Sequence, residues 1–121
     1  MNILIADDSE HFREIISNTI MNGLGNTILA SDGYEALQHL SNSTVDLLIT
    51  DIEMPVLDGL KLTQIARSLS IPVVVMCGND TSLERAQAEV FGASEFCVKD
   101  TGLADRVAQI VSELRGPDVS E

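Results

Sequence analysis

Short apolar runs alternate along the chain with longer segments in which apolar residues recur every three or four positions. The short runs are nearly continuous in apolar residues, which is typical of strands buried on both faces of a sheet. They occupy residues 2–6, 27–30, 47–49, 73–76 and 95–98. The longer segments have the apolar spacing of amphipathic helices. They lie within residues 12–20, 34–40, 62–69, 83–90 and 103–114.

This alternation of strand and helix predicts an α/β fold in which one parallel sheet carries helices on both faces. Parallel strands need crossover connections, and such crossovers are right-handed, which leads to this layered arrangement. Five βα units are too few for an eight-stranded barrel, so we expect an open, doubly wound sheet. The length of 121 residues suits one domain. We expect that domain to span residues 1–115, with a short acidic tail at 116–121.

The charge of the chain narrows the classes of partner. Nineteen Asp and Glu residues against seven Lys and Arg residues give a formal net charge of -12. The resulting field repels nucleic acid phosphates and anionic membranes, and it attracts divalent cations and basic protein surfaces. The sequence shows no basic leader and no long apolar segment. We therefore expect a cytoplasmic domain that binds neither nucleic acid nor membranes and whose two cysteines are free thiols.

The central predicted strand ends on an acid. The apolar run 47–49 leads to Asp51, and the following Met54-Pro55 cannot extend a strand ladder. Asp58-Gly59 is a turn signal before the next helical pattern. The carboxylate of Asp51 is therefore predicted at the carboxyl end of the strand, the edge at which open α/β sheets bind ligands.

Other charged residues are predicted at the same edge. Asp7 and Asp8 follow the first strand, and Lys99 follows the fifth. Three converging carboxylates repel one another unless a cation lies among them. Oxygen ligands without a cluster of histidine or cysteine suit Mg²⁺, with Mn²⁺ as an alternative. A carboxylate beside Mg²⁺ and a lysine has the nucleophile, the metal and the fixed cation that phosphoryl transfer needs.

Taken together, these motifs resemble the receiver domain of two-component response regulators, including the chemotaxis regulators, over essentially the whole chain. Each motif is weakly specific alone, but the set at these spacings is highly specific. The matching pieces are Asp7-Asp8, residues 30–33, Asp51 with Met54-Pro55 and Asp58-Gly59, Ile71-Pro72, and Lys99. The resemblance implies the flavodoxin-like strand order 2-1-3-4-5.

The resemblance also implies a phosphoacceptor signalling role. Asp51 would accept a phosphoryl group from a histidine kinase or a phosphotransfer protein. Asp8 and Asp51, with Asp7 through a water molecule, would hold Mg²⁺, and the backbone carbonyl of Glu53 would complete its protein ligands. Lys99 would pair with the phosphoryl oxygens. Such a domain is not an enzyme acting on a separate substrate, although it assists its own phosphorylation and dephosphorylation.

Three further positions follow from the resemblance. Phe96 lies at the aromatic switch position of the family, although a plain core residue is an equally good interpretation. Glu53 and Asn79 lie where the family tunes dephosphorylation, or they are ordinary solvated residues. The output would be a downstream protein partner or an output domain absent from this chain.

Two departures from the family pattern alter these expectations. Cys77 replaces the usual Thr or Ser of the switch, and a thiol is a weak hydrogen-bond donor. We expect phosphorylation to survive and its coupling to a conformational change to weaken. The alternative is a receiver-like interaction module that binds partners without phosphorylation. Asp100 replaces the usual proline after Lys99, so we expect a trans peptide there.

Overall fold

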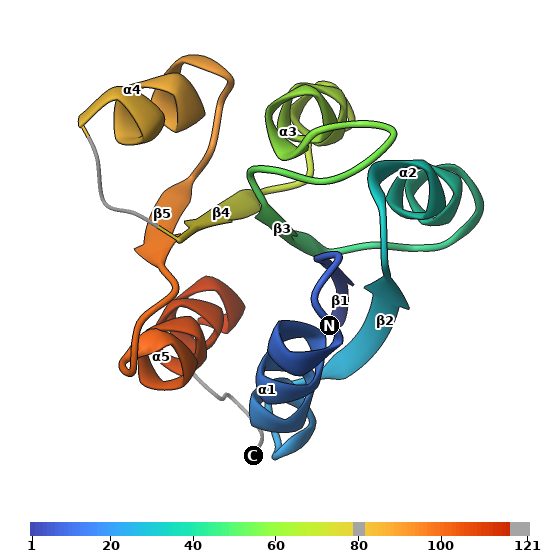
Figure 1. Cartoon of the computed structure of the whole chain (residues 1–121). Helices are drawn as coiled ribbons and strands as arrows, with labels where there is room; N and C mark the ends of the chain where they lie inside the picture. Colours follow the sequence, from blue (N-terminus) through green and yellow to red (C-terminus); the bar gives the residue numbers. More distant parts are fainter. Residues whose placement is uncertain (79–81, 117–121) are drawn as a thin grey trace.

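In a computed structural model that describes residues 1–78 and 82–116, five parallel strands form one sheet in the order β2-β1-β3-β4-β5 (Figure 1). The strands are β1 (Asn2–Ala6), β2 (Asn26–Ala30), β3 (Leu47–Asp51), β4 (Val73–Cys77) and β5 (Glu95–Val98). The predicted α/β class and the strand order implied by the resemblance are both confirmed.

Five helices follow the five strands. They are α1 (Glu10–Met21), α2 (Gly33–Asn42), α3 (Gly59–Ser68), α4 (Ser82–Val90) and α5 (Leu103–Arg115). Helices α1 and α5 cover one face of the sheet, and α2, α3 and α4 cover the other, as Figure 1 shows. The chain is therefore doubly wound, as the sequence predicts.

The core consists of two apolar layers, one on each face of the sheet. Successive side chains of a strand point to opposite faces, so Ile3 and Ile5 contribute to one layer and Leu4 to the other. The first layer is completed by Ile16 and Ile20 of α1 and by residues of α5. All five residues of β3 are buried, which explains why its sequence lacks apolar–polar alternation.

Side-chain caps begin three of the helices close to the ends of the strands. The hydroxyl of Ser9 accepts a hydrogen bond from the Phe12 N–H at 3.3 Å, so Ser9 caps α1. Asp32 caps α2 and Asp58 caps α3 in the same way. These three capping residues therefore fix where α1, α2 and α3 leave the sheet edge.

The carboxyl end of the domain is helical up to Arg115. The guanidinium of Arg115 donates to the Gly23 carbonyl oxygen at 3.0 Å, which ties α5 to the loop after α1. Most of the expected acidic tail, residues 117–121, lies outside the described residues. Within the described part of the chain, none of the helices combines the length and the apolar character needed to cross a membrane.

Candidate functional site

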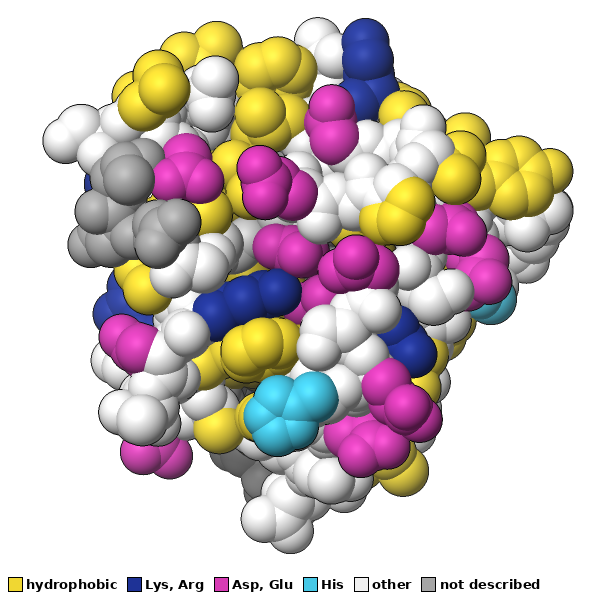
Figure 2. Space-filling model, viewed as in Figure 1, with side chains coloured by type: hydrophobic (Ala, Val, Ile, Leu, Met, Phe, Trp, Pro, Cys, Tyr) yellow, Lys and Arg dark blue, Asp and Glu magenta, His cyan; other side chains and the backbone are white. Residues whose placement is uncertain are grey.

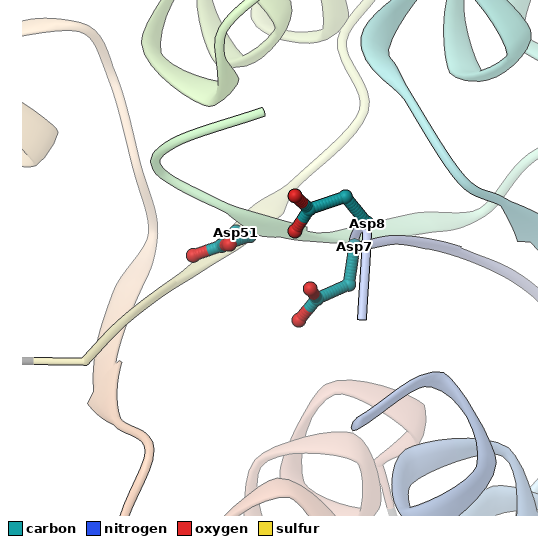
Figure 3. A group of neighbouring side chains, drawn as sticks. All are labelled: Asp7, Asp8 and Asp51. Atoms are coloured by element: carbon teal, nitrogen blue, oxygen red, sulfur yellow. The ribbon is translucent and has the colours of Figure 1, made fainter. Parts of the chain in front are cut away.

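The three predicted carboxylates meet at the carboxyl edge of the sheet. Strands β1 and β3 are neighbours, so Asp7, directly after β1, lies beside Asp51, the last residue of β3. Oxygen atoms of Asp7, Asp8 and Asp51 lie within 4.8 Å of one another (Figure 3). Asp7 is fully buried and Asp51 is 8% exposed, whereas Asp8 faces solvent.

Backbone groups hold the two buried carboxylates in place. Asp7 Oδ1 accepts a hydrogen bond from the Ser9 N–H, and Asp51 Oδ1 accepts one from the Ile52 N–H, both at 2.9 Å. Each Oδ1 atom is thus used within its own loop, and each Oδ2 atom faces the site. Gly59 contributes by close approach, because a Cβ atom there would collide with the Asp51 carbonyl oxygen.

Lys99 reaches this pair from the end of β5. Its Nζ atom lies 2.7 Å from Asp7 Oδ2 and 3.2 Å from Asp51 Oδ2. The same ammonium lies over the Phe12 ring of α1, 4.4 Å from the ring centroid, a cation–π arrangement. The sequence gives no sign of this role for Phe12, because an apolar residue at helical spacing is already explained by the core.

The buried setting changes the acidity of these groups. Burial, together with the negative charge of Asp7, raises the pKa of Asp51 from its ordinary 3.8 to about 6, although the Lys99 ammonium opposes the rise. Burial alone would lower the pKa of Lys99, but its hydrogen bond to Asp7 and the charges of Asp51 and Asp7 raise it overall. At neutral pH Asp51, with a pKa of about 6, is therefore mostly ionised beside the Lys99 ammonium.

The donor set fits a divalent cation. By formal charge, three carboxylates against one ammonium leave two negative charges, which one divalent cation balances. The donors are oxygen atoms, the type that Mg²⁺ and Mn²⁺ prefer. Within the described residues, the buried Asp7 Oδ2 atom faces Lys99 and receives no backbone hydrogen bond. Asp8, exposed at the rim, leaves an open side from which hydrated metal can enter.

The other predicted residues lie around this centre. Cys77 is the last residue of β4, and its thiol donates to Glu84 Oε2 of α4 at 2.8 Å. Phe96 is buried in the layer beneath α4, and the Arg85 guanidinium lies 4.6 Å above its ring. Glu53 is exposed in the loop between β3 and α3.

Two further expectations concern Asn79 and the peptide bond after Lys99, and two contacts of α4 were not expected. Asn79 lies outside the described residues. The described chain contains no cis peptide, so the bond between Lys99 and Asp100 is trans as expected. The contacts of Glu84 with Cys77 and of Arg85 with Phe96 were not found from the sequence. Both depend on how α4 is rotated over the sheet, which its apolar spacing does not specify.

Comparisons with known proteins agree with this geometry. The family model of the response regulator receiver domain matches residues 3–111. The chain is 32% identical over 117 residues to the response regulator MprA of Mycobacterium leprae, covering 95% of this chain and 51% of MprA. It is 32% identical over 111 residues to the Regulator of RpoS of Escherichia coli K12, covering 90% of this chain and 33% of that protein. The chain thus spans about half the length of MprA and a third of the Regulator of RpoS.

Solved structures show the same similarity. The receiver domain of the Francisella response regulator 1452 matches with a TM-score of 0.83 at 26% identity, covering 93% of this chain and 94% of that one. The chemotaxis response regulator CheY4 of Vibrio cholerae matches with a TM-score of 0.81 at 25% identity, covering 92% and 98%.

Proposed function

Because the chain belongs to the response regulator receiver domain family, we propose that it accepts a phosphoryl group on Asp51 from a histidine kinase or a phosphotransfer protein. The observation that carries the proposal is the meeting of Asp7, Asp8 and Asp51 with the Lys99 ammonium at one sheet edge. If the site were only a structural ion pair between Lys99 and the buried acids, the exposed third carboxylate of Asp8 would have no role.

The proposed reaction is an in-line phosphoryl transfer. A carboxylate oxygen of ionised Asp51 attacks the phosphorus of a phosphohistidine and forms the P–O bond of an acyl phosphate. The P–N bond breaks, and its electron pair remains on the imidazole nitrogen of the donor, which takes up a proton. The raised pKa of Asp51 supports this role, because a carboxylate poorly stabilised by its surroundings is a better nucleophile.

Each neighbouring residue has a proposed part in this transfer. Asp7 and Asp8 would hold Mg²⁺ together with Asp51 and the Glu53 carbonyl oxygen, and bound Mg²⁺ supplies charge neutralisation of the phosphoryl oxygens. Lys99, at 3.2 Å from Asp51 Oδ2, would pair with a phosphoryl oxygen carried on that carboxylate. Glu53 would also influence the access of water during dephosphorylation.

The consequences for signalling are proposed on the same basis. The phosphoryl group on Asp51 would carry about -1.5 to -2 charge in place of the single carboxylate charge, and this change beside β4 and α4 would alter binding of a downstream protein or an output domain. We assign this activity to residues 1–115 and a cytoplasmic location to the domain. The rival interpretation, a module that binds partners without phosphorylation, gains no support from the relatives, which are named response regulators.

The test uses a small phosphodonor. With acetyl phosphate and Mg²⁺, intact-mass measurement should show one added phosphoryl group, which alkali removes because acyl phosphates are labile. Asp51→Asn should abolish the addition. Asp58→Asn is the matched control, since asparagine can still cap α3 and the site carboxylates remain. Labelling of Asp51→Asn, or no labelling of the wild type, would refute the proposal.

A further inference from the structure

A groove separates α4 from the loop that leads from β3 into α3. It has a volume of about 550 Å³, within the usual range for sites that enclose apolar groups of a ligand. Its apolar lining comes from Ile52, Leu60 and Leu83. Ile52 is buried at the floor, whereas Leu83 at the rim is 67% exposed. Burial of a leucine side chain is favourable, so a partner that covered Leu83 would gain binding free energy.

The rim of this groove is acidic. Glu53, Asp58 and Glu84 line it, and none of the described residues in its lining is basic. In Figure 2, hydrophobic side chains gather over α4 and α3 next to Asp and Glu side chains, and a Lys or Arg side chain stands at the outer edge of α3. An apolar floor fixes where a partner docks, and the carboxylates around it determine which charge that partner must carry.

We propose that this groove between α3 and α4 binds a cationic amphipathic segment of a partner protein. Apolar side chains of the segment would enter between Leu60 and Leu83, and flanking Lys or Arg side chains would meet Glu53 and Asp58. An amphipathic helix suits this arrangement, because its apolar side chains lie along one face and its charged side chains flank that face. The inference does not depend on phosphorylation of Asp51.

Charge favours this occupant over the alternatives. A second copy of the chain carries the same net charge of -12 and would be repelled. The chain's own last residues, Pro117-Asp118-Val119-Ser120-Glu121, contain two acids and no base. An anionic lipid surface is disfavoured for the same reason. A basic protein segment satisfies both the apolar floor and the acidic rim.

The groove also adjoins the candidate site. Ile52 and Glu53 directly follow Asp51 in the chain, and the Glu84 carboxylate in its wall accepts the hydrogen bond of the Cys77 thiol at 2.8 Å. Any change in the position of α4 would therefore alter the width of the groove. The Ile52 N–H also donates to Asp51 Oδ1 at 2.9 Å, and this hydrogen bond connects the floor of the groove to Asp51.

The experiment uses three labelled synthetic peptides and the unphosphorylated chain. The first peptide places leucines at helical spacing with lysines on the other positions. The second has the same composition in scrambled order, and the third carries glutamate in place of lysine. Fluorescence anisotropy should show binding of the first peptide, weaker binding of the scrambled one and none of the acidic one.

Matched variants locate the binding surface. Leu83→Ser should weaken binding about tenfold, as expected for an anchoring contact, whereas Val90→Ser, an 82% exposed position on the same helix, should leave it unchanged. Gln87→Lys in the groove should weaken binding most at low salt. Gln109→Lys, the same change on α5 across the sheet, should have little effect.

Several outcomes would overturn the proposal. Equal affinity for the ordered and scrambled lysine peptides would indicate attraction to the overall acidic charge alone. Equal effects of Leu83→Ser and Val90→Ser would assign the peptide to another surface. So would amide shift mapping with the first peptide if the amides of Ile52 and Leu60 did not shift. Failure of the first peptide to bind would also reject the inference.

Discussion

Cys77 ends β4 with a buried thiol, and the hydrogen of that thiol is directed to the Glu84 carboxylate of α4. A phosphoryl group on Asp51 would present a second acceptor, so Cys77 would have to leave Glu84 to bind it. A hydrogen bond to a charged group contributes roughly 1.5–3 kcal/mol, and a thiol contributes less than a hydroxyl. The residue expected to transmit the signal is therefore a weak donor with a competing partner.

We expect Cys77→Thr to leave Asp51 phosphorylatable and to enlarge the response at residues 79–90 and at Phe96. A gain of some 1.4 kcal/mol would raise the ratio of the shifted to the resting state by about tenfold. Amide shift mapping with beryllofluoride, a phosphoryl mimic, measures the response. Glu84→Ala, which removes the competing acceptor, should act in the same direction. A saturated shift in the wild type, unchanged in both variants, would contradict this.

Asp8 permits a separate test of the metal site. It contributes an exposed carboxylate to the group formed with Asp7 and Asp51, without contact to Lys99 among the described ion pairs. Asp8→Asn should therefore largely abolish a weak Mg²⁺ binding that calorimetric titration detects in the wild type. Asp105→Asn, at an exposed position of α5, is the control that keeps binding. Equal binding by wild type and Asp8→Asn would reject the assignment.

At the scale of elements, α3 and α4 end in the same backbone motif with different residues. The Ile71 N–H bonds the Ala66 carbonyl at 3.0 Å after α3, and the Ala93 N–H bonds the Ala88 carbonyl at 2.9 Å after α4. This Schellman pattern requires a left-handed residue just before the bonded N–H. Gly92 fills that position after α4 with φ 102°, whereas Ser70 fills it after α3 with φ 64°.

Ser70→Gly should therefore stabilise the chain. A side chain in the left-handed region costs roughly 1–2 kcal/mol, and the greater freedom of glycine in the unfolded chain offsets part of that gain. We expect the free energy of unfolding to rise by about 0.5–1 kcal/mol in urea titrations. Ser68→Gly, within the last turn of α3, should lower it by a similar amount. The opposite order of the two variants would contradict the motif assignment.

The elements show what the sequence can predict. All ten strands and helices were recognisable, because buried strands such as residues 2–6 and 73–76 leave short apolar runs and Asp-Gly turns mark where helices begin. The convergence of Asp7, Asp8, Asp51 and Lys99 followed from strand ends alone. The strand order did not follow from the pattern and came from the family resemblance, since apolar spacing does not say which strands are neighbours.

The apolar–polar pattern of the sequence did not predict side-chain contacts between elements. The Lys99 ammonium over Phe12 and the Cys77 thiol on Glu84 join a strand end to a helix. Each depends on the rotation of a helix about its axis, which packing in the two core layers fixes. The cap of α1 is likewise not specified by residue type, because the side chains of both Asp8 and Ser9 are of a kind that can cap, and the structure shows Ser9 in this role.

For the whole molecule, the buried carboxylate of Asp51 makes stability depend on pH. Its pKa is about 6 in the folded chain against an ordinary 3.8, mainly because of burial. The folded state therefore holds the proton more tightly than the unfolded state. The stabilising contribution of protonated Asp51 is fully present below pH 3.8 and is lost as the pH rises through about 6. At neutral pH the ionised group opposes folding.

Asp51→Asn, which keeps the shape without the charge, should consequently raise the free energy of unfolding near pH 8. At about 1.36 kcal/mol per pH unit, the rise in pKa from 3.8 to about 6 corresponds to a gain of about 2–3 kcal/mol. The gain should shrink steadily as the pH falls towards 4, because protonated Asp51 then resembles asparagine. Urea titrations in chelator-treated buffer measure this gain without any stabilisation by bound metal.

The control is Glu89→Gln, at an exposed acid of α4, which should change the free energy of unfolding little at either pH. A gain of equal size at pH 8 and pH 4 would mean that shape and not charge is responsible, and a loss at pH 8 would mean that the ion pair with Lys99 outweighs burial.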